Sequence, residues 1–318
     1  MDTRAIMKAT GFVVLTLVSI PSNLIIFCAF LHTQLADGKL MPADVILCHL
    51  VWANLMVAFS RSIPQTLSAF GNKNLFDDIG CKIVIFWFRV FRGLSISLTC
   101  LLSTYQAVVI APATSKLALL KLKLPQYLLL LLFLLYLFCG VTSVNPIIFT
   151  VAYLINNTIP PYTFNLEFCF TPYPDYPTFI GQGFTNFLRD FIFIVLMAVM
   201  SAYILILLYR HSQKVKHIRS SDRGHSGARA ETRASQVVVT LVILYVIFFG
   251  VDNAIWLYSL STVRVAVLLS DIRIFFATLY TSVCPIVILL TNPKVKSKLR
   301  PIRAAQDSQL KEASMSNT

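Results

Sequence analysis

The chain has 318 residues, of which 57% are hydrophobic and only 13% are charged. A soluble domain of this length needs a far more polar surface, so the composition excludes a soluble globular protein and predicts a chain that crosses a membrane several times. The formal charge of +13 suggests nucleic-acid binding at first, but the placement of the basic residues argues against that class.

Apolar windows long enough to cross a bilayer, about 20 residues each, recur seven times. We expect helices at about 10–32, 44–70, 81–110, 126–152, 181–210, 235–260 and 265–291. The first window is longer than the apolar core of a signal peptide and is read as a retained helix. The predicted fold is an all-α membrane protein with a seven-transmembrane helix bundle as a single domain over 1–302. A short inner-surface helix is expected at 293–301 and a cytoplasmic tail at 303–318.

Basic residues between the windows predict the orientation. With the N-terminus outside, the inner loops and tail hold 17 Lys and Arg, and the outer side holds at most six, Arg273 among them. The positive-inside rule therefore favours an extracellular N-terminus and a cytoplasmic C-terminus, although Arg4 and Lys8 against Lys39 alone favour the reverse. The basic charge thus serves topology, and no nucleic-acid partner is expected.

Five of the seven cysteines lie well inside the apolar windows, where a free thiol is usually a small hydrophobe. Cys81 stands at the outer start of the third helix and Cys169 in the loop before the fifth, both on the oxidising side. We expect a disulfide between them that holds this loop over the mouth of the bundle. The same loop contains Asn156-Asn157-Thr158, a pattern that predicts a glycan on Asn156.

Charged residues inside the helices gather at one depth. With a rise of about 1.5 Å per residue, Arg89 and Arg92 lie roughly 12 and 16 Å below the outer boundary. The same level holds Arg61, Arg189, Asp190 and Asp252. Four arginines meet two aspartates at this level, so one-to-one pairing leaves two arginines without a carboxylate. Charge in hydrocarbon is costly, so these two arginines need another compensating group.

Two explanations of these charges stay open. The arginines could pair internally, with Asp190 and Asp252 each holding an arginine of the third helix. Alternatively, the charges line an outward-facing ligand cavity with spare positive charge. The candidate aromatic rim is Phe86, Trp87, Phe88, Trp256 and Tyr258. We favour the cavity and expect Arg89 or Arg92 to face a small amphipathic anion such as a carboxylate or sulfate, since arginine stays protonated in proteins.

Helical spacing predicts which faces point into the bundle, because residues three and four apart share a face. The third helix has a polar stripe of Arg92, Ser95, Thr99, Ser103 and Gln106. The sixth helix has a face of Tyr245, Phe249, Asp252 and Trp256.

Three long sequence blocks narrow the class of seven-helix protein. They read "HLVWANLMVAFSRSIPQT", "DDIGCKIVIFWFRVFRGLSISLTCLLSTYQAVVIAP" and "LRDFIFIVLMAVMSAYILILLYRHSQKVKHIRS". Two short blocks at the inner ends read "KLKLPQY" and "TNPK". Over nearly the whole chain, these blocks resemble the vomeronasal type 1 receptors and their olfactory class A-related relatives, which are G protein-coupled receptors.

The resemblance implies an odorant or pheromone receptor in the plasma membrane of chemosensory neurons. Its expected partners are a small-molecule ligand, the lipid bilayer and a heterotrimeric G protein of the inhibitory type, with no cofactor and no metal. The basic third inner loop and the inner end of the third helix are expected to dock the G protein. The residues in question are Gln106, Lys214, Lys216 and Arg219.

The chain also departs from the broader rhodopsin-like pattern. The third helix ends in Thr104-Tyr105-Gln106 where an acidic-Arg-aromatic triplet would stand. Asn54 occupies the place where an Asp often helps to bind sodium. These departures put the usual ionic lock and sodium site in doubt, and Asn23 could hydrogen-bond Asn54 instead.

Other function classes remain as alternatives. Bitter-taste receptors belong to the same broad class and come closest. A multi-pass transporter or channel also places charges at the midplane, but the chain shows no internal repeat. An intramembrane enzyme would need a clustered His/carboxylate or Ser/His site, and His49 is the only histidine expected within a span, so we expect no enzyme.

Overall fold

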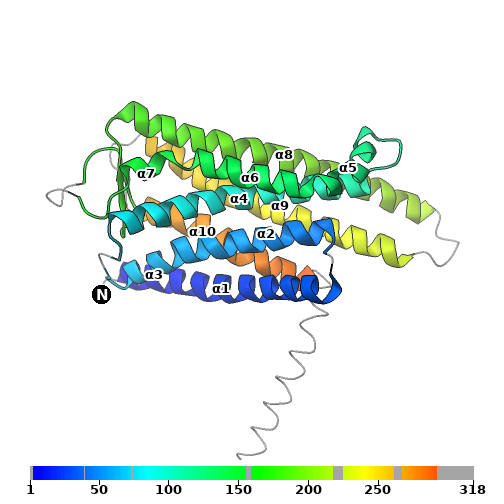
Figure 1. Ribbon diagram of the computed structural model, residues 1–318, viewed down its shortest axis with the longest axis horizontal. Helices are drawn as coiled ribbons and strands as arrows, with labels where there is room; N and C mark the ends of the chain where they lie inside the picture. The colour runs from blue at the N-terminus through cyan, green and yellow to red at the C-terminus, as the bar shows by residue number, and fades with distance from the viewer. Residues whose placement is uncertain are drawn as a thin grey trace, which may run out of the picture.

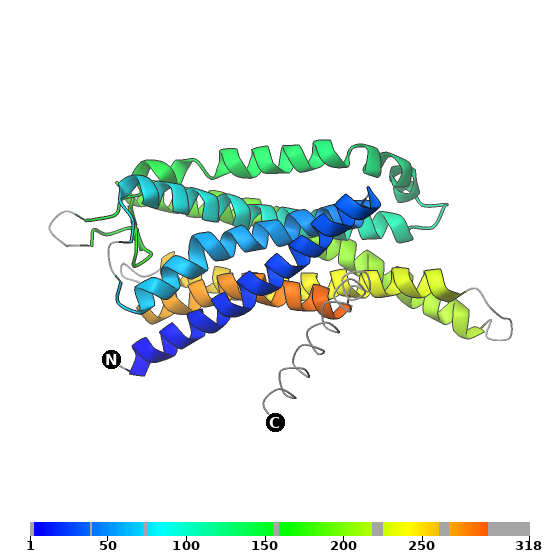
Figure 2. The ribbon, with the colours of Figure 1, turned by 60° about the horizontal axis from the view of Figure 1, so that its bottom comes forward.

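A computed structural model describes residues 3–38, 40–72, 75–154, 159–217, 225–260 and 267–291. Seven helical stretches in this part of the chain are long and apolar enough to cross a membrane. They are Ile6–Ala36, Pro42–Ala69, Asp78–Ile110, Leu128–Phe149, Tyr176–Arg210, Ser235–Tyr258 and Asp271–Leu290. They lie along one another in a single elongated bundle (Figures 1 and 2), which confirms the predicted all-α membrane fold with seven transmembrane helices.

The first three spans precede the first long connection. They comprise α1 (Thr3–Asp37), α2 (Pro42–Val57), the π-helix η1 (Ala58–Ser62), α3 (Ile63–Ala69) and α4 (Asp78–Ile110). The rest comprises the 3₁₀ turn η2 (Lys116–Leu119), α5 (Leu120–Gln126), α6 (Leu128–Thr142), α7 (Asn145–Phe149), β1 (Thr163–Asn165), β2 (Phe170–Pro172), α8 (Tyr176–His217), α9 (His225–Leu260) and α10 (Val267–Thr291).

The second span contains a wide turn that the sequence analysis did not predict. Pro64 has no N–H, and in a regular helix its ring would clash with the carbonyl of Ser60. The chain widens instead into η1, which is closed by a bond from the Ile63 N–H to the Ala58 carbonyl. Arg61 lies in this wide turn and is only 3% exposed.

The fourth span is shorter than the expected 126–152 and is broken. α6 ends at Thr142, and a separate helix, α7, begins at Asn145 with Pro146 in its first turn. Proline restricts the residue before it and is well placed at a helix start, so it favours a new helix over continuation of the old one.

The core of the bundle is built around α4, which packs against α2, α6, α8 and α9. Ser95, Thr99 and Ser103 of its predicted polar stripe are almost fully buried. Thr99 and Ser103 donate hydrogen bonds to the backbone carbonyls four residues earlier, so these hydroxyls are satisfied within the helix. The predicted inward face of α9 is also buried, which confirms the direction that helical spacing gave to both helices.

A two-stranded hairpin closes one end of the bundle, where the sequence analysis had placed only a loop. β1 and β2 are antiparallel, with Thr163 opposite Pro172 and Asn165 opposite Phe170. The predicted disulfide joins Cys169, beside β2, to Cys81 in the first turn of α4, with the Cα atoms 5.8 Å apart. Figure 1 shows the hairpin at the end where α1 and α4 begin; we call this end the disulfide end.

Two aspartates cap helices at the disulfide end. Asp77 accepts a hydrogen bond from the Gly80 N–H at the start of α4. Asp175 accepts one from the Thr178 N–H at 2.7 Å, at the start of α8. Hydrogen bonds from Thr178 lower the pKa of the Asp175 carboxyl, as expected for a carboxylate at a helix N-terminus.

Candidate functional site

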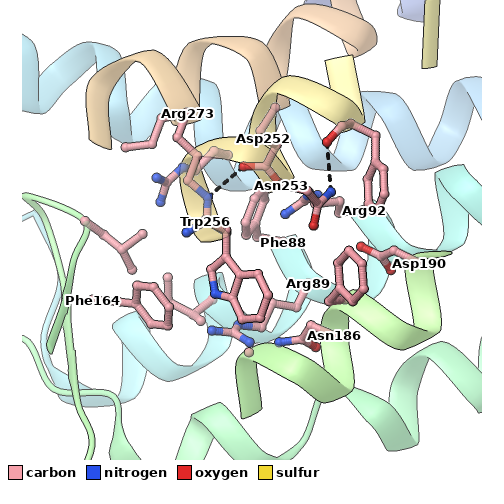
Figure 3. Close-up of a pocket in the computed structure, with 18 of the residues that line it drawn as sticks. Phe88, Arg89, Arg92, Phe164, Asn186, Asp190, Asp252, Asn253, Trp256 and Arg273 are labelled. Atoms are coloured by element: carbon pink, nitrogen blue, oxygen red, sulfur yellow. Dashed lines mark hydrogen bonds and ion pairs between the residues drawn. The ribbon is translucent and has the colours of Figure 1, made fainter. Parts of the chain in front are cut away.

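A cavity of about 150 Å³ lies between η1, α4, α8, α9 and α10, and residues of the hairpin line it from the disulfide end. Its lining includes all eight residues predicted to bind a ligand: Arg61, Phe88, Arg89, Arg92, Arg189, Asp190, Asp252 and Trp256. Figure 3 shows many of them converging on one space from α4, α8 and α9. The structure therefore brings together residues that are almost 200 positions apart in the sequence.

The predicted aromatic rim is wrong in part, because Phe86, Trp87 and Tyr258 do not line the cavity. Trp87 and Tyr258 are exposed on the outside of the bundle, and Trp87 stacks on Phe91. The reason is helical phase: Ile85, Phe88 and Arg92 share the inward face of α4, and the neighbouring positions 86 and 87 point away from it.

Asp252 holds two arginines from two other helices. Its carboxylate, with a side chain 5% exposed, accepts from Arg92 Nη2 at 2.6 Å and from Arg273 Nε at 2.7 Å. Figure 3 shows Asp252 between these two side chains. Arg273, counted above among outer-side residues, instead reaches inward from the second turn of α10. Asp252 thus connects α4, α9 and α10.

Asp190 is paired with its neighbour Arg189. The sequence analysis had expected an arginine of α4 in this place. Arg189 Nε donates to Asp190 Oδ1 at 2.8 Å, and both side chains are 6% exposed. The Arg189 guanidinium also reaches Thr142 of α6 at 3.3 Å. It packs against the backbone of α4 at Gly93, where an added Cβ would lie only 3.0 Å from Arg189 Cζ.

Arg61 and Arg89 form no ion pair within the described residues. The Arg61 guanidinium lies over the rings of Phe88 and Phe168, at 5.2 and 5.6 Å from their centroids. Its Nη1 is buried without a hydrogen-bond partner in the described part of the chain. Arg89 lies near the neutral hydroxyl of Tyr173, which is buried and has no hydrogen-bond partner among the described residues. Among the lining residues, five arginines meet two aspartates, a surplus of three positive charges.

The hairpin turn is anchored by Glu167, which the sequence analysis did not single out. Glu167 has a φ of 70°, a left-handed conformation that is uncommon outside glycine. Its carboxylate accepts from Gln65 Nε2 at 2.9 Å and pairs with Lys8, which also pairs with Asp271 at 2.7 Å. The turn is therefore tied to α1, α3 and α10. The sequence offered one signal that could have identified this anchor, namely an acidic residue two positions before Cys169.

A polar network continues below the cavity. Ser95 donates to Asn54 Oδ1 at 2.7 Å, and the hydroxyls of Thr99 and Tyr280 lie 3.0 Å apart. Asn23 donates to the carbonyls of Ser19 and Thr281. The suggested hydrogen bond between Asn23 and Asn54 is therefore replaced by separate partners for each side chain.

The remaining predicted residues lie away from the cavity or outside the described residues. Gln106 is buried near the end of α4 that is opposite the disulfide end. Lys214 and Lys216 lie on α8, but the description does not include their side chains. Asn156, Arg219, the expected helix at 293–301 and the tail at 303–318 lie outside the described residues.

Comparison with known proteins identifies the family. The model of the vomeronasal organ pheromone receptor family matches residues 7–300. The chain belongs to this family. This receptor is 37% identical to olfactory receptor class A-like protein 1 of Danio rerio, over 100% of this chain and 99% of that protein. It is 27% identical to vomeronasal type-1 receptor 1 of Gorilla gorilla gorilla, over 90% of this chain and 80% of that protein.

The fold of the receptor is also that of a solved structure. The crystal structure of squid rhodopsin matches with a TM-score of 0.72 at 15% identity, covering 94% of this chain and 85% of that one. At this identity the likeness shows the fold alone. Together with membership of the vomeronasal family, it makes this chain a chemosensory G protein-coupled receptor of the membrane and not an enzyme.

Proposed function

We propose that this receptor detects a small amphipathic acid, an odorant or pheromone, in the cavity beneath the hairpin. Binding there activates a heterotrimeric G protein of the inhibitory type at the other end of the bundle. The disulfide end faces outward from the plasma membrane of a chemosensory neuron. The observation that carries this proposal is the charge of the cavity lining, with five arginines against two aspartates.

An anionic ligand follows from the cost of buried charge. Arginine cannot lose its proton in a protein, so burial leaves a cation that needs an anion, water or hydrogen-bond acceptors. Asp190 and Asp252 already hold three of the arginines. A carboxylate or sulfate entering the cavity supplies the charge that the lining lacks.

The aromatic walls select the body of the ligand. Phe187 stacks nearly parallel to Trp256, with the ring centroids 5.8 Å apart, and to Phe249 at 6.4 Å. Trp256 reaches this position because Gly183 has no side chain, since a Cβ there would lie 2.6 Å from the indole. A volume of about 150 Å³ suits a ligand built on one ring, because benzene fills an apolar cavity of that size.

Two features support the proposed orientation. The excess of Lys and Arg in the loops opposite the disulfide end favours a cytoplasmic location for those loops. The disulfide between Cys81 and Cys169 favours the oxidising side for the hairpin. A cavity on this side is accessible to ligands from outside the cell.

The charge preference can be measured in cells that report G protein activation through calcium. One-ring carboxylic acids are expected to activate the receptor at concentrations at least tenfold lower than their methyl esters, a difference of about 1.4 kcal/mol. The ester is the matched control because it keeps the ring and removes the charge. Equal potency of acids and esters across the panel would contradict the proposal.

The G protein contact can be tested in the third inner loop. Replacing Lys214, Lys216 and Arg219 together by Gln is expected to lower G protein activation several-fold at unchanged surface level. The reason is that basic loops attract acidic partner surfaces and the anionic inner leaflet, at about 1 kcal/mol per charge near the lipid. The measurement is nucleotide exchange on an inhibitory-type G protein.

A charge-conserving variant provides the control for this loop. Lys214→Arg, Lys216→Arg and Arg219→Lys together keep the same charge and should retain activation. If the Gln variant activates as well as the charge-conserving one, the loop serves topology only.

A further inference from the structure

We propose that Arg61 is the residue that binds the acidic group of the ligand, and that Arg92 and Arg189 serve internal ion pairs. This inference rests on the proposed acid-binding function and assigns the anion to one residue of the cavity. It moves the anion site from the middle of α4, where sequence reasoning placed it, to the wide turn of the second span.

The existing ion pairs separate the arginines of the cavity into two groups. Arg92 and Arg273 each bond a different oxygen of Asp252, at 2.6 and 2.7 Å. Arg189 bonds Asp190 at 2.8 Å. A ligand acid at any of these three would compete with a carboxylate that is already in place. Arg61 and Arg89 have no such carboxylate partner among the described residues.

Arg61 is the more buried of these two and the less satisfied. It is 3% exposed, and its Nη1 has no hydrogen-bond partner within the described residues. An unmade hydrogen bond of a buried charged donor is expensive. Arg89 is only half-buried, and in the described part of the chain none of its nitrogens is both buried and without a partner. The free energy gained from an incoming anion is therefore largest at Arg61.

The surroundings of Arg61 leave the edge of its guanidinium for a ligand. The rings of Phe88 and Phe168 cover the group at 5.2 and 5.6 Å, in the distance range of cation–π contacts. All five N–H donors of arginine lie in the plane of the guanidinium, in a fork that matches the two oxygens of a carboxylate. Phe88 also lines the cavity, so a ligand ring next to the acid meets an aromatic surface.

Glu167 does not take this place, although its charge acts on Arg61 at longer range. One carboxylate oxygen of Glu167 pairs with Lys8 and the other accepts from Gln65. The acid of the hairpin turn is thus committed to anchoring the turn. The π-turn of η1 supports the assignment, because single π-turns within helices frequently mark functional sites.

The test compares Arg61→Gln with Arg92→Gln and Arg89→Gln in the full-length, detergent-purified receptor. The probes are phenylacetate, benzoate and benzenesulfonate, with the methyl esters as uncharged controls, and the readout is the ligand-induced rise in melting temperature. In Arg61→Gln the apparent affinity for the acids should fall at least tenfold and the acid preference should vanish. In Arg92→Gln and Arg89→Gln the preference for acid over ester should remain.

Two results would overturn the assignment while the acid-binding function stands. One is an acid preference that survives in Arg61→Gln and is lost in Arg92→Gln or Arg89→Gln. The other is an unchanged affinity for the acids in Arg61→Lys, a variant that keeps the positive charge but loses the planar fork of donors. If Arg61→Gln does not fold, the result for Arg61→Lys decides the assignment. A wild-type receptor that binds acids and esters equally overturns both the assignment and the function on which it rests.

Discussion

Asp252→Asn is expected to destabilise the receptor by about 3–5 kcal/mol, the range for removing one partner of a buried ion pair. The cost is large because Asp252 holds both Arg92 and Arg273, and a neutral amide leaves two arginines without their carboxylate. The melting temperature of the purified receptor should fall markedly, and the fraction at the cell surface should fall with it.

A matched substitution separates charge from shape. Asp175→Asn makes the same chemical change at the exposed start of α8, where an amide oxygen can still accept from the Thr178 N–H, so its stability should stay near wild type. In a double-mutant cycle, Arg92→Gln added to Asp252→Asn should cost less than it does alone, because the pair is already broken. A melting temperature for Asp252→Asn equal to that of Asp175→Asn would contradict this account.

The spans were predictable because hydropathy depends on each residue alone. Transfer into lipid favours a run of apolar residues whatever its partners are, and the seven windows therefore correspond to the seven membrane-length helical stretches of the described residues. Helical phase likewise depends only on spacing, so the buried faces of α4 and α9 followed from the sequence. The disulfide followed from the location of Cys81 at the outer start of the third helix and of Cys169 in the outer loop before the fifth.

Pairing could not be predicted in the same way, because it depends on helix rotation and on side-chain reach. Neighbouring residues on a helix do not normally face each other, so the bond between Arg189 and Asp190 was not expected. It forms because Arg189 lies flat against Gly93 of another helix. Arg273 was missed for a related reason: its position near the start of α10 suggested solvent, and only the packed bundle shows that it reaches Asp252.

Backbone irregularities were missed although proline signalled two of them. The window over 44–70 was read as one regular helix, but Pro64 follows a π-turn that contains Arg61. Pro146 likewise begins a new helix inside the fourth window. Hydropathy does not register either effect, since it describes the transfer of each side chain into lipid and not the effect of proline on the backbone. The position of Arg61 in the cavity lining depends on the first of these irregularities.

The hairpin has two independent attachments to the bundle. One is the disulfide to α4. The other is Glu167, bonded to Lys8 and Gln65, on α1 and α3. The residues directly before these attachments, Phe164 and Leu166 among them, line the cavity. The geometry of the binding site therefore depends on both attachments being intact.

Loss of the disulfide is expected to reduce surface expression several-fold and to abolish the response to acids. In Cys169→Ser, a cross-link with a sequence separation of 88 disappears. The loop-closure model gives about 4–5 kcal/mol for a loop of that length. This is an upper value, because the helices inside the loop are already ordered in the bilayer. Glu167 still holds the turn, so part of the receptor should fold, but with a hairpin that no longer fixes the cavity lining.

The matched controls distinguish the bond from the loss of a thiol. Cys28→Ser removes a free cysteine exposed on the outside of the bundle and should leave expression and response unchanged. Cys81→Ser combined with Cys169→Ser should be no worse than either single change, because both remove the same bond. Labelling of Cys81 and Cys169 by a thiol reagent in non-reduced receptor at the cell surface would show that no bond exists. In the bonded receptor, both cysteines react only after reduction, and the response to acids is lost as they become reactive.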